Sequence, residues 1–260
     1  MPPSRTQITT HDNLHISVAV HGESQPTTVL VHGWAVSGQI WECVAQRWNQ
    51  PGRLLIPDLR GTGQSTRQAT SHTIEDHGKD LIAMIETMAD GPVDLVGHSM
   101  GGLISQWLAT QRPDLLRSLT LVSPTPAGGV PFGPEDIAFF EALYDQPDQV
   151  IGSMIRTQPD PQALAACVQD VANNSRQAYV SNFKSWREAS FAHALGTITT
   201  PTAVLGGERE EPLTPDLLQA AVVNLIPKAT FTLIPGVGHY PQFEAPDAFT
   251  KLLQDTIPGR

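Results

Sequence analysis

A single serine, Ser99, lies between two glycines in the stretch VDLVGHSMGG, residues 93–102. The pattern G-x-S-x-G comes directly after a strand-like apolar run and directly before a helix-like run, GLISQWLATQ. A strand-to-helix turn this tight requires small neighbours, because a Cβ atom would clash there. It also holds the serine at the N-terminus of a helix, where amide donors and the helix dipole stabilise a developing anion. The stretch therefore predicts a nucleophilic serine.

A serine hydroxyl is a poor nucleophile at neutral pH, so it needs a general base, and the base needs a carboxylate to orient it. His239 lies in the glycine-rich stretch PGVGHYPQFEAPDAF, between the last predicted strand and the last predicted helix. Glu210 lies in VLGGEREEPLTP, after the preceding strand, where Glu208 and Glu211 are the neighbouring carboxylates that could replace it. The chain order of serine, acid and histidine predicts a triad of Ser99, Glu210 and His239.

Short β-rich runs alternate with helical patterns along most of the chain, which is typical of a parallel sheet flanked by helices. Several runs are continuously apolar, as expected for strands that helices cover on both faces. The predicted strands are residues 15–20, 28–31, 53–57, 93–96, 118–122, 202–205 and 230–234, and the predicted helices are about 73–88, 100–111, 215–225 and 247–256. The pattern indicates the α/β fold class.

The alternation stops between residues 125 and 196, where helical patterns follow one another without a convincing strand. These patterns are PEDIAFFEALY, PDQVIGSMI, PQALAACVQDVA and SRQAYVSNFKSWREASFAHAL. We therefore expect a core domain formed by residues 1–124 and 197–260, with residues 125–196 inserted as a helical cap.

Ordered motifs along nearly the whole chain resemble those of α/β-hydrolase fold serine enzymes, the group of small esterases, lactonases and carbon–carbon bond hydrolases. The motifs are LVHGWAVSGQIW, PDLRGTGQS, VGHSMGG, PTAVLGGERE and GHYPQFEAPDAF. The resemblance implies a mostly parallel central sheet flanked by helices, with a helical cap insertion. It also implies Ser99 as nucleophile, His239 as general base and acid, and the backbone amides of Met100 and Trp34 as oxyanion hole. Members most often carry aspartate where this chain has Glu210, and some place the acid after the strand that precedes the insertion.

The resemblance implies hydrolysis of a small to medium carboxylic ester or lactone through an acyl-enzyme, with no cofactor. A carbon–carbon bond hydrolase of ring-cleavage diketones is the alternative within the group, whose members share a GHSMGG-like elbow and an aromatic residue after the histidine, as Tyr240 follows His239. A non-hydrolytic receptor that binds a small ligand is the alternative outside catalysis.

Aromatic residues recur at near-helical spacing in residues 125–196. Most should join the cap to the main domain, and a few should line an apolar cleft over the serine. We expect Phe139, Phe140, Trp186 and Tyr240 to line this substrate pocket. Such a cleft would favour an uncharged, partly hydrophobic substrate.

Other polar residues near the motifs are expected to support the site without reacting. His32 should form hydrogen bonds that hold the oxyanion loop, and His98 should point away from the serine and pack or cap. Asp58 and Arg60, in the DLRGTG stretch, should brace the loop near the site.

The composition limits partners and location. The chain carries 16 Lys and Arg against 26 Asp and Glu, a formal net charge of -10, which repels nucleic acid and anionic membranes. The N-terminus lacks the apolar segment of a secretory signal, and no run approaches the roughly 18 apolar residues of a spanning helix. Cys43 and Cys167 lack CxxC spacing, and the histidines form no HExxH pattern, so we expect free thiols and no metal. We therefore expect a cytoplasmic monomer or homodimer that acts on a small molecule.

Overall fold

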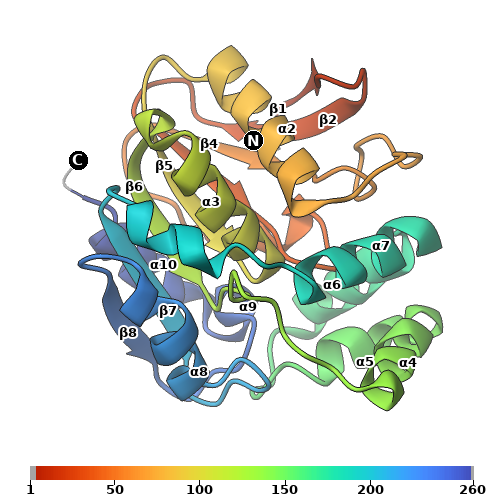
Figure 1. Cartoon of the computed structure of the whole chain (residues 1–260). Coiled ribbons are helices and arrows are strands. Elements are labelled where there is room, and N and C mark those ends of the chain that lie inside the picture. The colour runs from red at the N-terminus through yellow and green to blue at the C-terminus, as the bar shows by residue number, and fades with distance from the viewer. Residues whose placement is uncertain (1–3, 259–260) are drawn as a thin grey trace.

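An eight-stranded sheet in the order β1-β2-β4-β3-β5-β6-β7-β8 forms the centre of the fold (Figure 1). The structure is a computed structural model that describes residues 4–258. The strands β3 to β8 run parallel to one another, whereas β2 pairs antiparallel with both β4 and β1. The strands are β1 Ser4–Thr9, β2 His15–His21, β3 Thr27–Val31, β4 Arg53–Pro57, β5 Val93–His98, β6 Leu116–Val122, β7 Thr202–Gly207 and β8 Thr230–Ile234. The predicted α/β fold with a mostly parallel sheet is confirmed.

The burial of each strand follows its place in the sheet. Every residue of β3 and of β5 is buried, as expected for central strands covered on both faces. In β1 only Ile8 is buried, because this strand lies at the edge of the sheet. β1 was not predicted, since its sequence SRTQIT lacks an apolar run.

Helices that follow the strands cover the sheet. α2 and α3 lie side by side on the near face in Figure 1, and α1, α9 and α10 pack against one another as a second group. Thr73 caps the N-terminus of α2. Its hydroxyl accepts from the amide of Asp76, and the Asp76 carboxylate accepts from the amide of Thr73, which is the pattern of a capping box. The bounds are η1 Gly38–Trp41, α1 Glu42–Ala45, α2 Ile74–Met88, α3 Met100–Gln111, η2 Pro113–Leu115, α8 Pro215–Ala221, η5 Val223–Leu225, α9 Pro241–Glu244 and α10 Pro246–Thr256.

Between β6 and β7 the chain forms helices only. Residues 125–196, all of which the structure describes, hold no strand, and we call them the cap segment. Figure 1 shows its helices α4 to α7 gathered at one end of the sheet. Their bounds are α4 Pro134–Ala142, η3 Leu143–Asp145, α5 Pro147–Gly152, α6 Pro161–Ala172 and α7 Arg176–Arg187, and η4 Ala192–Thr197 leads on toward β7.

Aromatic rings join the cap segment to the sheet. Trp34 follows β3, and its ring centroid lies 4.5 Å from that of Tyr179 and 5.4 Å from that of Phe183. Phe140 and Trp186 complete the surroundings at 6.2 and 6.0 Å. These offset and edge contacts add to the free energy of apolar burial. The expected role of the cap aromatics in joining the two parts is confirmed.

Two further expectations concern single features. Cys43 and Cys167 are free thiols, as predicted. Within residues 4–258, no helix combines the length and the apolar character that a bilayer crossing needs.

Candidate active site

Ser99 occupies a strained turn between β5 and α3. Its backbone has φ 53° and ψ −120°, a left-handed conformation that residues with a Cβ atom rarely adopt. The two flanking glycines are required by contact: a Cβ on Gly97 would lie 2.4 Å from the carbonyl oxygen of Gly101, and one on Gly101 would lie 2.4 Å from that of His32. The amide of Ser99 donates to the carbonyl of Val122 at 3.0 Å, which ties the turn to the next strand.

His239 and Glu210 meet at the same end of the sheet. Glu210 lies in the loop after β7 and His239 in the loop after β8. The distance from His239 Nδ1 to Glu210 Oε1 is 2.5 Å, and both residues are buried. Because Nδ1 is directed at the carboxylate, Nε2 is the ring nitrogen left to exchange a proton with another group. This arrangement can orient an imidazole as a general base.

The neighbouring carboxylates lie elsewhere. Glu211 has a side chain that is 75% exposed, and its nearest cation is Arg156 Nη2 at 3.7 Å. Glu208 accepts a hydrogen bond from the amide of Gly236 at 2.9 Å. Of the three acidic candidates in this loop, Glu210 is therefore the one whose carboxylate reaches His239.

Ser123 holds the other oxygen of the acid. Its hydroxyl donates to Glu210 Oε2 at 2.5 Å, so both carboxylate oxygens are engaged. Ser123 is the first residue after β6 and has φ 43°. This contact was not predicted from the sequence. The available signal was a hydroxyl residue at the end of a strand that neighbours both β5 and β7.

Two backbone amides near Ser99 have no acceptor. Within residues 4–258, the amides of Trp34 and Met100 form no hydrogen bond, and these are the two amides expected to form an oxyanion hole. Gly33 brings the first of them close, because a Cβ on Gly33 would lie 2.9 Å from Ser99 Cβ. Unsatisfied buried amides are uncommon in folded proteins, and these two are free to donate to a bound anion.

His32 fixes the loop that carries Trp34. Its Nδ1 donates to the carbonyl of Gly33 at 2.8 Å, and its Nε2 accepts from the amide of Leu59 at 2.9 Å. Burial lowers the pKa of His32 to about 4, so the ring is neutral at pH 7 and keeps one tautomer. The expected structural role of His32 agrees with these contacts.

His98 does more than pack. Its Nε2 donates to the backbone carbonyl of His239 at 2.7 Å, and the two ring centroids lie 4.7 Å apart. Burial, and then the proximity of His239, hold the pKa of His98 well below its usual value. A neutral His98 therefore fastens the loop that carries His239 to the turn that carries Ser99.

Ser99 and His239 line the same narrow cavity, which has a volume of ≈ 40 Å³. Among the described side chains, no hydrogen bond yet joins the serine hydroxyl to the imidazole. The walls are mainly apolar and contain three of the four expected pocket residues, Phe140, Trp186 and Tyr240. The remaining wall residues are Trp34, Thr125, Val130, Phe132, Met154, Pro212 and Leu213.

The expectation for Phe139 is wrong. Its side chain is 54% exposed and it lines a surface groove with Leu143 and Gln149 instead of the cavity. Consecutive residues of an α-helix point about 100° apart. Since Phe140 of α4 faces the cavity, Phe139 is directed away from it.

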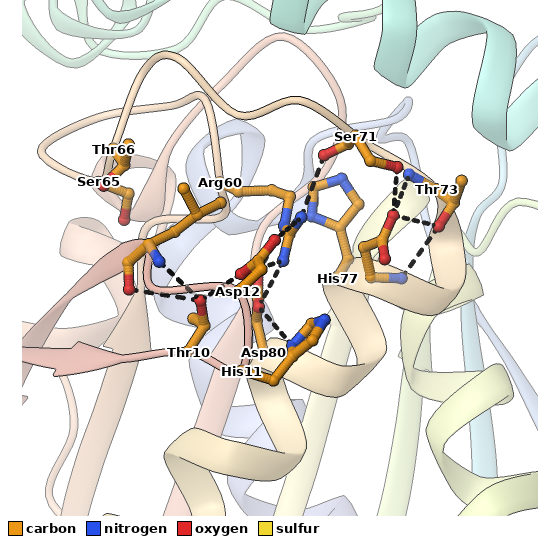
Figure 2. A network of polar contacts seen from close by, with 12 residues as sticks. Thr10, His11, Asp12, Arg60, Ser65, Thr66, Ser71, Thr73, His77 and Asp80 are labelled. Carbon is orange, nitrogen blue, oxygen red and sulfur yellow. Dashed lines mark hydrogen bonds and ion pairs between the residues drawn. The ribbon is translucent and has the colours of Figure 1, made fainter.

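Asp58 and Arg60 each bond to neighbouring loops, and Figure 2 shows the polar network around Arg60. Arg60 is fully buried, and its Nε and Nη2 each lie 2.7 Å from a carboxylate oxygen of Asp80. Its Nη1 donates to Asp12 at 3.0 Å. His11, Asp12 and Asp80 have possible metal-ligand atoms within 4.8 Å of one another, but both carboxylates are already paired with the Arg60 guanidinium. Asp58 accepts from the amide of Gly38 at 2.9 Å.

Known proteins that are similar to this chain include a lipase and esterases. Lipase LipV of Mycobacterium tuberculosis is 36% identical over 115 residues, which cover 44% of this chain and 43% of that protein. Pimeloyl-[acyl-carrier protein] methyl ester esterase of Nitrosomonas europaea is 26% identical and covers 92% of this chain and 97% of that protein. The structure of the esterase EaEST of Exiguobacterium antarcticum matches with a TM-score of 0.90 at 19% identity, over 98% of this chain and 100% of that chain. Residues 28–252 match the family model described as the alpha/beta hydrolase family, and the chain therefore belongs to that family.

Proposed function

We propose that the protein is a serine hydrolase that cleaves a small to medium, partly hydrophobic carboxylic ester or lactone. The observation that carries this proposal is the 2.5 Å contact between His239 and Glu210 beside a serine on a strained turn. A relay of this kind raises the nucleophilicity of a hydroxyl that would otherwise be inert at neutral pH. The names of the esterase and lipase relatives point the same way.

The proposed reaction has two halves. His239 Nε2 takes the proton of the Ser99 hydroxyl as Oγ attacks the carbonyl carbon, and the oxyanion accepts from the amides of Met100 and Trp34. The carbon–oxygen bond to the leaving alcohol then breaks, and His239 returns the proton to that oxygen. A water molecule deprotonated by His239 then attacks the acyl carbon. The bond from this carbon to Ser99 Oγ breaks, His239 returns the proton to Oγ, and the acid is released. Glu210 orients the ring and stabilises its charged form.

The cavity walls support an uncharged acyl group. No Lys, Arg, Asp or Glu side chain is among the described residues that line the cavity, so a charged acyl chain would lose its hydration without gaining a partner. Aromatic rings from α4 and α7 form part of the wall. We therefore propose that residues 125–196 act as a cap over a core domain formed by the rest of the chain.

The test is labelling with a fluorophosphonate and peptide mapping, followed by p-nitrophenyl esters of graded acyl length. Ser99 should be the labelled residue, and Ser99→Ala should lower kcat by on the order of 10⁵-fold or more. Ser190→Ala, which changes an exposed serine, is the matched control and should behave as the wild type. Labelling at another residue would refute the assignment. Labelling with turnover of ring-cleavage diketones but of no ester would favour the carbon–carbon hydrolase, and neither labelling nor turnover would favour a binding role.

A further inference from the structure

The loop that carries the Trp34 amide is held from the cap segment. We call residues 33–37 the oxyanion loop. On the core side, the hydrogen bonds lie at the two ends of this loop: His32 Nδ1 donates to the Gly33 carbonyl, and the amides of Gln39 and Ile40 donate to the hydroxyl and the carbonyl of Ser37. On the cap side, α6, α7 and the turn between them contact the loop at three residues. Trp34 Nε1 donates to the Tyr179 carbonyl of α7 at 2.8 Å, and Asn174 Nδ2, from the turn, donates to the Ala35 carbonyl at 2.6 Å. Asp170 of α6 accepts from the Ser37 amide at 2.6 Å and from its hydroxyl at 2.7 Å.

The oxyanion loop needs such support because its backbone is strained. Ala35, the residue after Trp34, has φ 65°, in the left-handed region, where a residue with a Cβ atom is strained. The Trp34 N–H lies in the preceding peptide, between Gly33 and Trp34, and relaxation of the backbone at Ala35 would shift Trp34 and with it the direction of this N–H. The Asn174 bond to the Ala35 carbonyl and the Asp170 bond to the Ser37 amide oppose this relaxation.

We propose that Asp170 and Asn174 are positioning residues that keep the Trp34 amide directed at the oxyanion, so that the cap segment takes part in assembling the catalytic site. This inference rests on the proposed function. It assigns the cap a second task besides lining the substrate cavity. It also predicts that changes in α6, outside the cavity wall, alter kcat rather than KM.

The chemistry of Asp170 suggests a rescuing variant. Burial raises the pKa of Asp170 to about 6, with a further contribution from Asp58, while the Ser37 hydrogen bonds and Arg5 act in the opposite sense. The carboxylate is therefore ionised at about pH 8. Asparagine at this position can still accept from the Ser37 amide through Oδ1 and can donate through Nδ2 to the Ser37 hydroxyl. Alanine can do neither.

The experiment compares Asp170→Ala with Asp170→Asn at about pH 8, with Asp148→Ala as the matched control. Asp148 is an exposed carboxylate of the cap segment on α5. The readouts are kcat and KM for a p-nitrophenyl ester, and Ki for an aryl trifluoromethyl ketone, which adds to the serine and places a negative oxygen in the oxyanion hole. A lost oxyanion donor costs about 10²–10³-fold in kcat. Misdirection of one donor by Asp170→Ala should therefore lower kcat by about 10-fold or more.

The pattern expected is specific. KM should change by no more than about twofold, Ki should rise by the same factor by which kcat/KM falls, and Asp170→Asn should retain activity within about threefold. Asn174→Asp should resemble Asp170→Ala, because it keeps the shape but directs an acceptor at the Ala35 carbonyl. This second variant carries the test if Asp170→Ala does not fold.

Two outcomes would overturn the inference. In the first, the wild type is active and both Asp170→Ala and Asn174→Asp have the same kcat and Ki as the wild type. The other is a change in KM alone, which would assign α6 to substrate binding. Failure of the proposed function looks different, since the wild type itself would then neither be labelled by the fluorophosphonate nor hydrolyse esters.

Discussion

Replacing Glu244 by glutamine should destabilise the fold and displace the loop that carries His239. Glu244 lies at the end of α9, five residues after His239. The amide of His239 itself donates to the carbonyl of Met154 in the cap segment at 3.1 Å. The Glu244 carboxylate accepts hydrogen bonds from both segments that meet at this contact. From the histidine loop, the amides of Gly238 and Tyr240 donate at 3.1 and 3.0 Å. From the cap segment, the amide of Arg156 donates at 2.8 Å and the hydroxyl of Thr157 at 3.3 Å.

The size of the effect follows from counting acceptors. A carboxylate offers two oxygens, whereas glutamine offers one oxygen and turns an NH₂ group toward donors. At least one amide then loses its acceptor and another meets a hydrogen atom. Each buried donor left unsatisfied costs about 1–3 kcal/mol, so Glu244→Gln should lower the free energy of unfolding by about 2–4 kcal/mol. At about 2–4 °C per kcal/mol for a chain of this size, Tm should fall by about 5–15 °C.

Catalysis should fall as well, because His239 lies between two of the released amides. A displacement of about 1 Å in a catalytic group can cost about 10²-fold, so we expect kcat to decrease by at least about 10-fold. The assays are urea unfolding and p-nitrophenyl ester hydrolysis. Glu211→Gln is the matched control, since that side chain is 75% exposed and also lies near Arg156. Surface changes of this kind remain within about 0.5 kcal/mol. Equal stabilities of the two variants would refute the reasoning.

Three further predictions follow from the buried polar groups. Glu210→Gln should lower kcat by about 10³–10⁴-fold, as the loss of a triad carboxylate does elsewhere, and ester hydrolysis within about tenfold of the wild type would contradict its role. Arg60→Met should cost about 3–5 kcal/mol in urea unfolding because it leaves the Asp80 carboxylate buried without a cation, and an unchanged midpoint would argue against this. Burial lowers the pKa of His32 to about 4 and of His77 to about 3, from 6.5. Below pH 6.5 the unfolded chain therefore binds protons that the folded chain does not. The contribution of these histidines to stability should be complete above pH 6.5 and decrease as the pH falls toward 4. Equal unfolding free energies at about pH 7 and pH 5 would contradict this.

Local patterns in the chain identified the parts of the site that depend on neighbours in sequence. The turn at Ser99 was predictable because a Cβ on Gly97 would meet the carbonyl of Gly101, four residues away, so this requirement for a small residue is local. The requirement at Gly101 comes from the carbonyl of His32, which is distant in sequence. Glu210 and His239 were found because each follows a strand, and the carboxyl ends of parallel strands share one edge of a sheet. The helical cap segment was recognised because periodicity is also a local property.

Contacts between distant segments were decided by the tertiary structure alone. Ser123 and Glu210 are 87 positions apart, and Ser37 and Asp170 are 133 apart, and neither pair carries a pattern that links its members. The inward turn of Phe140 and the outward turn of Phe139 depend on how α4 docks, since both residues are equally apolar. Local patterns thus determined the sheet, the turn at Ser99 and the position of Glu210 and His239 after neighbouring strands. Packing decided which polar groups complete the site, because a hydrogen bond depends on the positions of two side chains after folding and not on their separation along the chain.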